Sequence, residues 1–92
     1  MDLEADLYEQ MTREGLKPER WSNGPDYRYP VHDHWYDKVI AVAKGSITFT
    51  LNNGSRQQIV TLEAGQRLEI PAHTPHSAQV GERGVVCLEA HR

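Results

Sequence analysis

The sequence lacks several features that would place it in particular classes of protein. It has one cysteine, Cys87, which excludes an intramolecular disulfide framework. Its longest apolar run, Val39 to Ala43, is far too short to cross a bilayer. Acids and bases are mixed along the chain and the formal net charge is -3, so no basic block is present to attract nucleic acid or an anionic membrane. The first ten residues are acidic and do not resemble a signal peptide, so we expect a cytoplasmic protein.

The length of 92 residues fits one small domain. The segment from Asp2 to Glu14 places Leu3, Leu7 and Met11 on one helical stripe, and Gly15 follows where a helix commonly stops. The sequence therefore predicts one short N-terminal helix with a connector over residues 1–20. Residues 21–92 are then expected to form a single barrel domain.

Beyond residue 20 the apolar pattern changes to that of strands. The stretch "SITFTL" alternates apolar Ile47, Phe49 and Leu51 with hydroxyl residues, and "NNGS" followed by "QQIVTL" predicts a hairpin. Glycine and proline divide the rest into about eight strand-sized pieces, which is typical of an all-β barrel or sandwich. The strand "VIAVA" is apolar on both faces, so its outer face needs a cover. The N-terminal helix or a second copy could supply it, and we expect a homodimer.

Two histidines two residues apart, His32 and His34, are the first candidates for a functional site. On a strand they would share one face, and a metal would need a third ligand from another strand. Downstream, "PAHTPHSAQV" offers His73 and His76, whereas His91 lies in an end expected to fray. The alternative is that these imidazoles only form hydrogen bonds in a polar barrel mouth. Cys87, in the apolar strand "GVVCLEA", is expected to be buried and inert.

The spacing of these residues resembles the two motifs of the cupin superfamily. In the first motif, glycine and five residues precede His-x-His, and glutamate and a further glycine follow. Here His32, His34 and Gly45 match, Lys38 stands at the glutamate position, and Gly24 lies two residues too far upstream. In the second motif the matching residues are Gly65, Pro71 and His76, with His73 in place of a glycine and Val80 in place of the asparagine.

This resemblance implies an all-β fold of the cupin type, a double-stranded β-helix or jelly-roll barrel, with one short helix outside it. It also implies a divalent metal held by His32, His34 and His76. Apart from the resemblance, Asp37 and His73 are further candidates for metal ligands because they lie close to these positions in the sequence. Zn, Ni, Fe, Cu and Mn are the transition metals expected there. Cupins include dioxygenases, isomerases, decarboxylases and non-catalytic binding domains, so the fold alone does not name a reaction. A small molecule in the barrel is the expected partner, in a metal-dependent enzyme or in a binding or sensing barrel.

Lys38 is the departure from the family pattern that needs an explanation. An ammonium group about 6 Å from a divalent ion opposes its binding by about 5 kcal/mol at an effective dielectric constant of roughly 20. Lys38 could turn to the barrel mouth and pair with Asp37 or Glu69, which is the arrangement we favour. It could instead be a neutral base or nucleophile, or replace the metal's charge in an anion-binding pocket. Lys38 and Tyr36 are the candidates for catalytic residues. A local bulge that turns Asp37 inward as a ligand is a fourth alternative.

Overall fold

The computed structural model describes residues 2–92, which form one helix and six strands. No helix within this range has the length and apolar character needed to cross a membrane. The elements are α1 (Leu3–Arg13), β1 (Glu19–Asn23), β2 (Arg28–His32), β3 (Lys38–Asn53), β4 (Arg56–Glu63), β5 (Arg67–Ile70) and β6 (His76–His91). The predicted all-β fold with one short N-terminal helix is confirmed.

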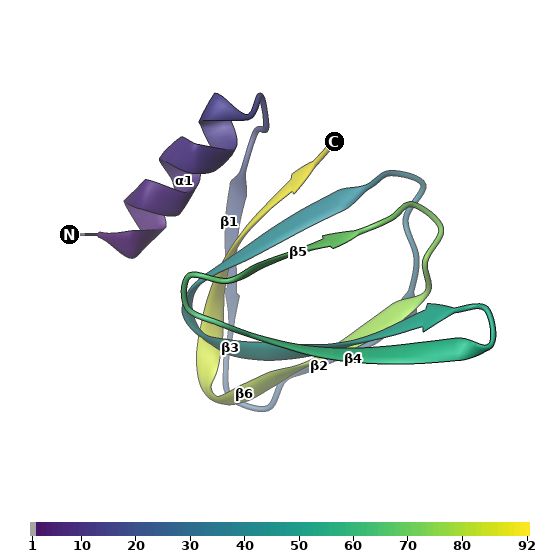
Figure 1. Cartoon of the computed structure of the whole chain (residues 1–92). Helices are drawn as coiled ribbons and strands as arrows, with labels where there is room; N and C mark the ends of the chain where they lie inside the picture. The colour runs from purple at the N-terminus through teal and green to yellow at the C-terminus, as the bar shows by residue number, and fades with distance from the viewer. Residues whose placement is uncertain (1) are drawn as a thin grey trace.

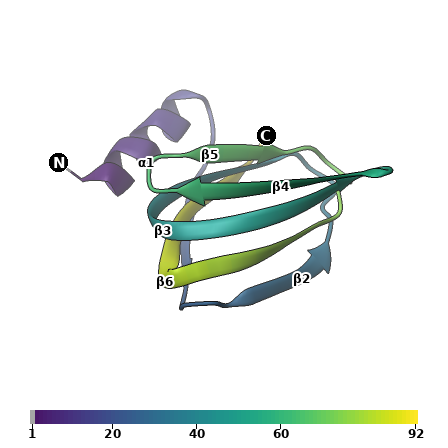
Figure 2. The same cartoon turned by 60° about the horizontal axis from the view of Figure 1, so that its bottom comes forward.

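Two long strands, β3 and β6, organise the sheet. Each has 16 residues, they pair antiparallel, and every other strand pairs with one of them. The first half of β3 lies between β5 and the second half of β6, and β1 pairs with that same half of β6. The second half of β3 lies between β4 and the first half of β6, which also pairs with β2. Figure 2 shows β2, β6, β3 and β4 side by side in this order.

The sheet folds over into two layers because β3 and β6 bend together. The pairing register of the two strands shifts around Lys44 and Gly45, and both Gly45 and Gly84 have positive φ, 79° and 78°. The two glycines approach so closely that a Cβ on Gly45 would overlap the carbonyl oxygen of Gly84. Only glycine fits such a conformation and such a contact. We call the layer of β1 and β5 the helix-side layer and the layer of β2 and β4 the open layer (Figure 1).

The expectation of about eight short strands was therefore wrong. The Lys44–Gly45 and Gly81–Gly84 segments, which we interpreted as breaks, are bends inside continuous strands. Among residues 2–92, no pairing joins β4 to β5 or β1 to β2, so the two layers form an open sandwich rather than a closed barrel.

The space between the layers is filled by alternate side chains of both long strands and their neighbours. This core comprises Ile40, Val42, Ile47, Phe49, Leu51, Leu62, Ile70, Ala78, Val80, Val85 and Cys87. Cys87 has no exposed surface, and burial raises the pKa of its thiol to about 12. The expectation of a buried, inert cysteine is thus confirmed.

Helix α1 covers the outer face of the helix-side layer (Figure 1). Leu7 and Met11 project from the helix onto Val39 and Ala41 of β3, and Leu16 joins them after the helix ends. Burying such side chains contributes about 1.5–3 kcal/mol each. The apolar strand therefore receives its cover within one chain, and it no longer gives a reason for a second copy. The homodimer stays a prediction.

Local sequence fixes where α1 begins and ends. The Asp2 carboxylate accepts hydrogen bonds from the backbone N–H groups of Glu4 (3.0 Å) and Ala5 (3.4 Å), which lack partners in the first helical turn. At the other end Gly15 adopts φ 84°, and the N–H of Leu16 donates to the carbonyl of Met11 (3.0 Å). This cap turns the chain so that Leu16 packs beside Met11.

The bend leads to a prediction about stability. Gly45→Ala should lower the free energy of unfolding by more than about 3 kcal/mol, because it combines backbone strain with a clash against Gly84. The matched control is Gly54→Ala, since Gly54 also has positive φ (65°) but a Cβ added there would meet no atom within 4 Å. The control should lose only about 1–2 kcal/mol. Urea unfolding of both variants measures the difference, and equal losses would show that the close approach does not hold the bend.

Candidate metal centre

The three histidines that the sequence indicated come together at one end of the sandwich. His32 ends β2, His76 begins β6, and the two residues are paired across the strands. Their ligand atoms and those of His34 all lie within 4.8 Å of one another. His34, however, does not lie on the strand with His32 as expected, because β2 ends at His32 and His34 belongs to the loop before β3. The loop, rather than strand alternation, returns the His34 ring to the group.

Backbone carbonyls fix the tautomer of two of these imidazoles. Nδ1 of His32 lies 2.8 Å from the carbonyl oxygen of Pro30, and Nδ1 of His76 lies 2.8 Å from that of Thr74. A carbonyl oxygen can only accept, so each Nδ1 carries the hydrogen and each Nε2 keeps its lone pair. This arrangement is the usual preparation of a histidine for binding a metal through Nε2.

The third imidazole, His34, has a buried Nε2 that forms no hydrogen bond with any residue of 2–92. Buried nitrogen atoms without a partner are rare, since each one loses its hydration without compensation. A metal ion bound by this atom and by the Nε2 atoms of His32 and His76 would remove that deficit. The donor set of three imidazoles thus fits a divalent transition metal.

The charge state of the group also suits a metal. Burial lowers the pKa of His34, and the positive charge of Lys38 lowers it further. Burial is likewise the main cause that lowers the pKa of His76, against the hydrogen bond to Thr74. Both imidazoles therefore favour the neutral form, which is the form that binds metals.

Aromatic stacking holds the His34 ring in place. The ring of Tyr36 stacks on His34 with centroids 5.0 Å apart, and the ring of His91 stacks in turn on Tyr36 with centroids 3.9 Å apart. His91 is the last residue of β6 and pairs with Lys38, so the expectation of a frayed end was wrong. Tyr36 does not line the interior cavity described below, and its observed contacts are those of a supporting residue. A catalytic role for Tyr36 stays a prediction.

Hydrogen bonds between the loop before β3 and the loop after β5 hold the His34 segment in place. The loop after β5 presents the N–H of His73 to the carbonyl of His34 (2.7 Å) and the N–H of Ala72 to Oδ1 of Asp37 (2.8 Å). Both loops lie at the end of the sandwich away from α1 (Figure 1). Asp37 and His73, the further candidates for metal ligands, are exposed and lie outside the group of three. Their observed contacts tie the His34 loop to its neighbour.

Lys38 points into the interior. It has the same orientation along β3 as Ile40, only 7% of its surface is exposed, and its Nζ lies 3.4 Å from Oε2 of Glu89 on β6. The expected partners were wrong, because Asp37 accepts from Ala72 and Glu69 pairs with Arg92. Lys38 does pair with a carboxylate, but inside the sandwich rather than at its mouth. The signal that could have identified Glu89 is a lone acid in the apolar strand "VVCLEA".

An interior cavity of about 340 Å³ connects these groups. His32, His76, Lys38 and Glu89 form its polar part, and the rest of its wall comprises Trp21, Asn23, Tyr29, Ile40, Ile47, Phe49 and Ala78. The volume is at the small end of ligand sites.

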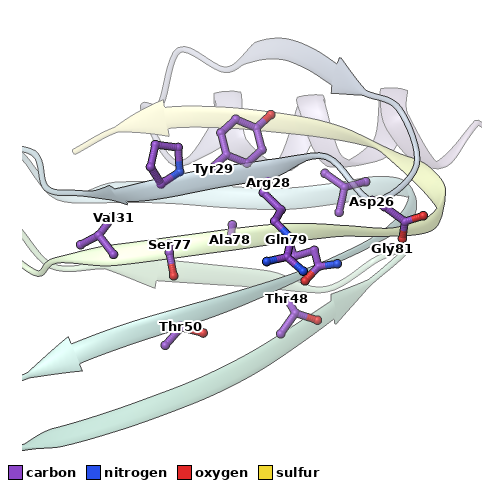
Figure 3. A pocket seen from close by; sticks show the side chains of 12 residues that line it. Asp26, Arg28, Tyr29, Val31, Thr48, Thr50, Ser77, Ala78, Gln79 and Gly81 are labelled. Atoms are coloured by element: carbon purple, nitrogen blue, oxygen red, sulfur yellow. The ribbon is translucent and has the colours of Figure 1, made fainter.

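A larger hollow of about 730 Å³ lies on the outer face of the open layer. Figure 3 shows its polar floor, to which Thr48, Thr50, Ser77 and Gln79 contribute side chains beside Arg28. None of the three clustered histidines lines it. The candidate functional side chains therefore lie around the smaller interior cavity and not around this hollow.

Comparison with solved structures identifies the fold. A structure of the DMSP lyases RdDddP and RnDddQII superposes with a TM-score of 0.74 at 27% identity, over 84% of this chain and 38% of the other. Oxalate decarboxylase from Bacillus subtilis gives 0.77 at 23% identity, over 83% and 20%. A cupin superfamily protein from Desulfitobacterium hafniense gives 0.70 at 17%, over 83% and 65%. This chain has the cupin fold.

The resemblance found in the sequence is therefore confirmed at the level of the fold. No protein-family model matches this chain, and no curated protein matches it in sequence. The chain spans less than two thirds of each of the three similar structures, and only a fifth of oxalate decarboxylase. One solved structure of oxalate decarboxylase concerns the Mn(II) centres of that protein. The metal and reaction of this chain do not follow from that likeness.

The lowered pKa values of His34 and His76 predict how the metal-free protein responds to pH. Because their folded pKa lies below the usual value of 6.5, the unfolded chain binds protons more readily as the pH falls. Their contribution to stability is therefore fully present above pH 6.5 and is lost below it. Urea unfolding of the chelator-treated protein at about pH 7.5 and about pH 5.5 should give the lower free energy at the lower pH.

The variant His34→Asn/His76→Asn should show a flatter dependence between these two pH values. His73→Asn is the control, because His73 is exposed and Asn tolerates its positive φ of 63°. A double variant with the same pH dependence as the control would show that other groups cause the loss.

Proposed function

We propose that this chain is a small metal-dependent cupin that binds one divalent transition metal through His32, His34 and His76. The observation that supports this most directly is the buried Nε2 of His34, which has no partner in residues 2–92 although two other imidazoles converge beside it. Zn, Ni, Fe, Cu and Mn all suit a site of this composition. The proposal includes a small oxygenated molecule as ligand or substrate in the interior cavity.

Three protein ligands leave open coordination positions, as catalytic sites require. A bound ion would supply Lewis-acid or oxygen chemistry of the dioxygenase or isomerase type. The residues of the chain would orient the ligand and exclude water. The apolar side chains of Ile40, Ile47 and Phe49 form the dry part of the cavity wall, while Lys38 and Glu89 provide charged groups next to the histidines.

A second candidate function is a metal-free binding or sensing barrel. One observation favours it: the ammonium group of Lys38 lies in the same cavity and adds to the effect of burial in lowering the pKa of His34 and His76, so it already provides a positive charge there. In that case the cavity would hold a small anion without a metal. Metal uptake separates the two functions.

Metal uptake tests the proposed function. The wild-type protein, incubated with Zn²⁺ and dialysed, should retain close to one equivalent, whereas His34→Ala should bind more than about a hundredfold more weakly because one of three ligands is lost. His73→Asn should retain zinc like the wild type, since His73 lies outside the group. Elemental analysis gives the zinc content, and circular dichroism checks that each variant folds. A wild type that retains no metal at any supplied concentration would contradict the proposal and favour the metal-free barrel.

A further inference from the structure

The ammonium group of Lys38 is only partly satisfied by its surroundings. Its side chain is 9% exposed, and its one ion-pair partner among residues 2–92 is Glu89, at 3.4 Å. That distance is long for a charge-assisted hydrogen bond, which is usually about 2.7–2.9 Å. An ammonium group has three N–H donors, and within the described chain Nζ forms no hydrogen bond with good geometry. Lys38 therefore has hydrogen-bond donors that no described residue uses, at the wall of the cavity.

The Glu89 carboxylate is held at its distance from Lys38 by a hydrogen bond to a second residue, Trp21. The indole Nε1 of Trp21 donates to Oε1 of Glu89 at 3.1 Å, which ties the carboxylate to the wall formed by β1. The other oxygen, Oε2, faces Lys38. The indole and the carboxylate thus fix one side of the ammonium group, and its other side adjoins the cavity that His32 and His76 also line.

The balance of charge in the cavity follows from the proposed function, on which this inference rests. Lys38 and Glu89 carry opposite charges, and imidazoles that bind a metal do so in their neutral form and add no charge. A divalent ion would then leave a net charge of +2 in a small cavity, with Lys38 and the ion both positive. An anion that lies between or beside the two positive groups would stabilise this arrangement.

The size and wall of the cavity limit that anion. A volume of about 340 Å³ admits a small molecule only, and the apolar wall leaves its charged group to the polar part of the cavity. A neutral ligand could accept a hydrogen bond from Lys38 but would leave the positive charges of the ion and of the ammonium group without compensation. A compact oxyanion would bind to the ion at its open coordination positions and would also accept hydrogen bonds from the ammonium group of Lys38.

We propose that the ligand of this cupin is a small carboxylate anion and that Lys38 is the residue that determines this specificity. One carboxylate of the ligand would accept hydrogen bonds from Nζ of Lys38, on the side opposite Glu89. The lysine at the glutamate position of the motif would then not be a lost metal ligand. It would be a ligand-binding residue whose repulsion of the metal is offset when the anion binds.

Two probes of nearly equal shape test this assignment: malonate, and its neutral diamide, malonamide. Calorimetric titration of the zinc-loaded wild type should show binding of malonate and much weaker binding of malonamide. Lys38→Met should weaken malonate binding by at least about tenfold, because a charge-assisted hydrogen bond is lost, and should leave malonamide binding unchanged. Lys44→Met is the matched control, since Lys44 lies on the same strand but is exposed and lines no part of the cavity.

Zinc content, measured on each protein before and after titration, keeps the two proposals apart. If the wild type and Lys38→Met both retain zinc and bind malonate with equal affinity, the role of Lys38 is overturned and the metal site still stands. Zinc retained by a wild type that binds malonamide as well as malonate, or neither, would also overturn it. A wild type that retains no zinc would contradict the proposed metal function. Malonate binding that still depended on Lys38 would then support the lysine assignment in a metal-free barrel.

Removal of Lys38 leaves Glu89 without its ion-pair partner, so Lys38→Met could fail to fold. The variant Lys38→Met/Glu89→Gln removes both charges and keeps the indole hydrogen bond of Trp21 to an amide oxygen. It should also weaken malonate binding by at least about tenfold. Lys38→Arg, which keeps the positive charge, should restore most of the affinity. Equal loss in the arginine and methionine variants would show that the side chain acts through packing and not through its charge.

Discussion

The close approach of Gly45 and Gly84 is the constraint on which the rest of this structure depends. Two strands of 16 residues cannot remain paired and also form two layers unless both bend at the same place. Glycine permits the positive φ angles and leaves room for backbone to touch backbone. Once the bend is made, the two halves of each long strand face each other across one core. His32 and His76 at the end of one layer and Lys38 in the other then line the same cavity.

The site combines two imidazoles whose tautomers suit metal binding with a third whose buried nitrogen has no hydrogen-bond partner among residues 2–92. Hydrogen bonds to the carbonyls of Pro30 and Thr74 fix two imidazoles in the tautomer that exposes Nε2. The His34 nitrogen is held by stacking and is buried without a partner among residues 2–92. A folded protein keeps such a group only when the remaining contacts compensate for it. This is the physical reason to regard the cluster as a binding site and not as three histidines that happen to be close.

The positive charge of Lys38 bears on whether a metal binds beside it. The family position that usually provides a negative ligand provides a positive charge here, and Glu89 neutralises that charge from another strand. The carboxylate in this cavity therefore pairs with Lys38, whereas the family motif places a carboxylate among the metal ligands. This arrangement explains how one chain can match the cupin spacing and still depart from it at Lys38 without losing a coherent site.

The sequence by itself determined the change from one N-terminal helix to strands, the helix limits, the candidate histidines and the fold family. These features depend on local periodicity and on residues such as Gly15, whose conformational role follows from its neighbours. It did not reveal that Gly45 bends a strand instead of ending it, because a glycine at a turn and a glycine at a bend look alike without their partner strand. Only the tertiary structure decided that Lys38 pairs with Glu89, a residue more than half the chain away. Side-chain partners across a folded sheet are set by register and by the bend, and neither is written in the spacing of nearby residues.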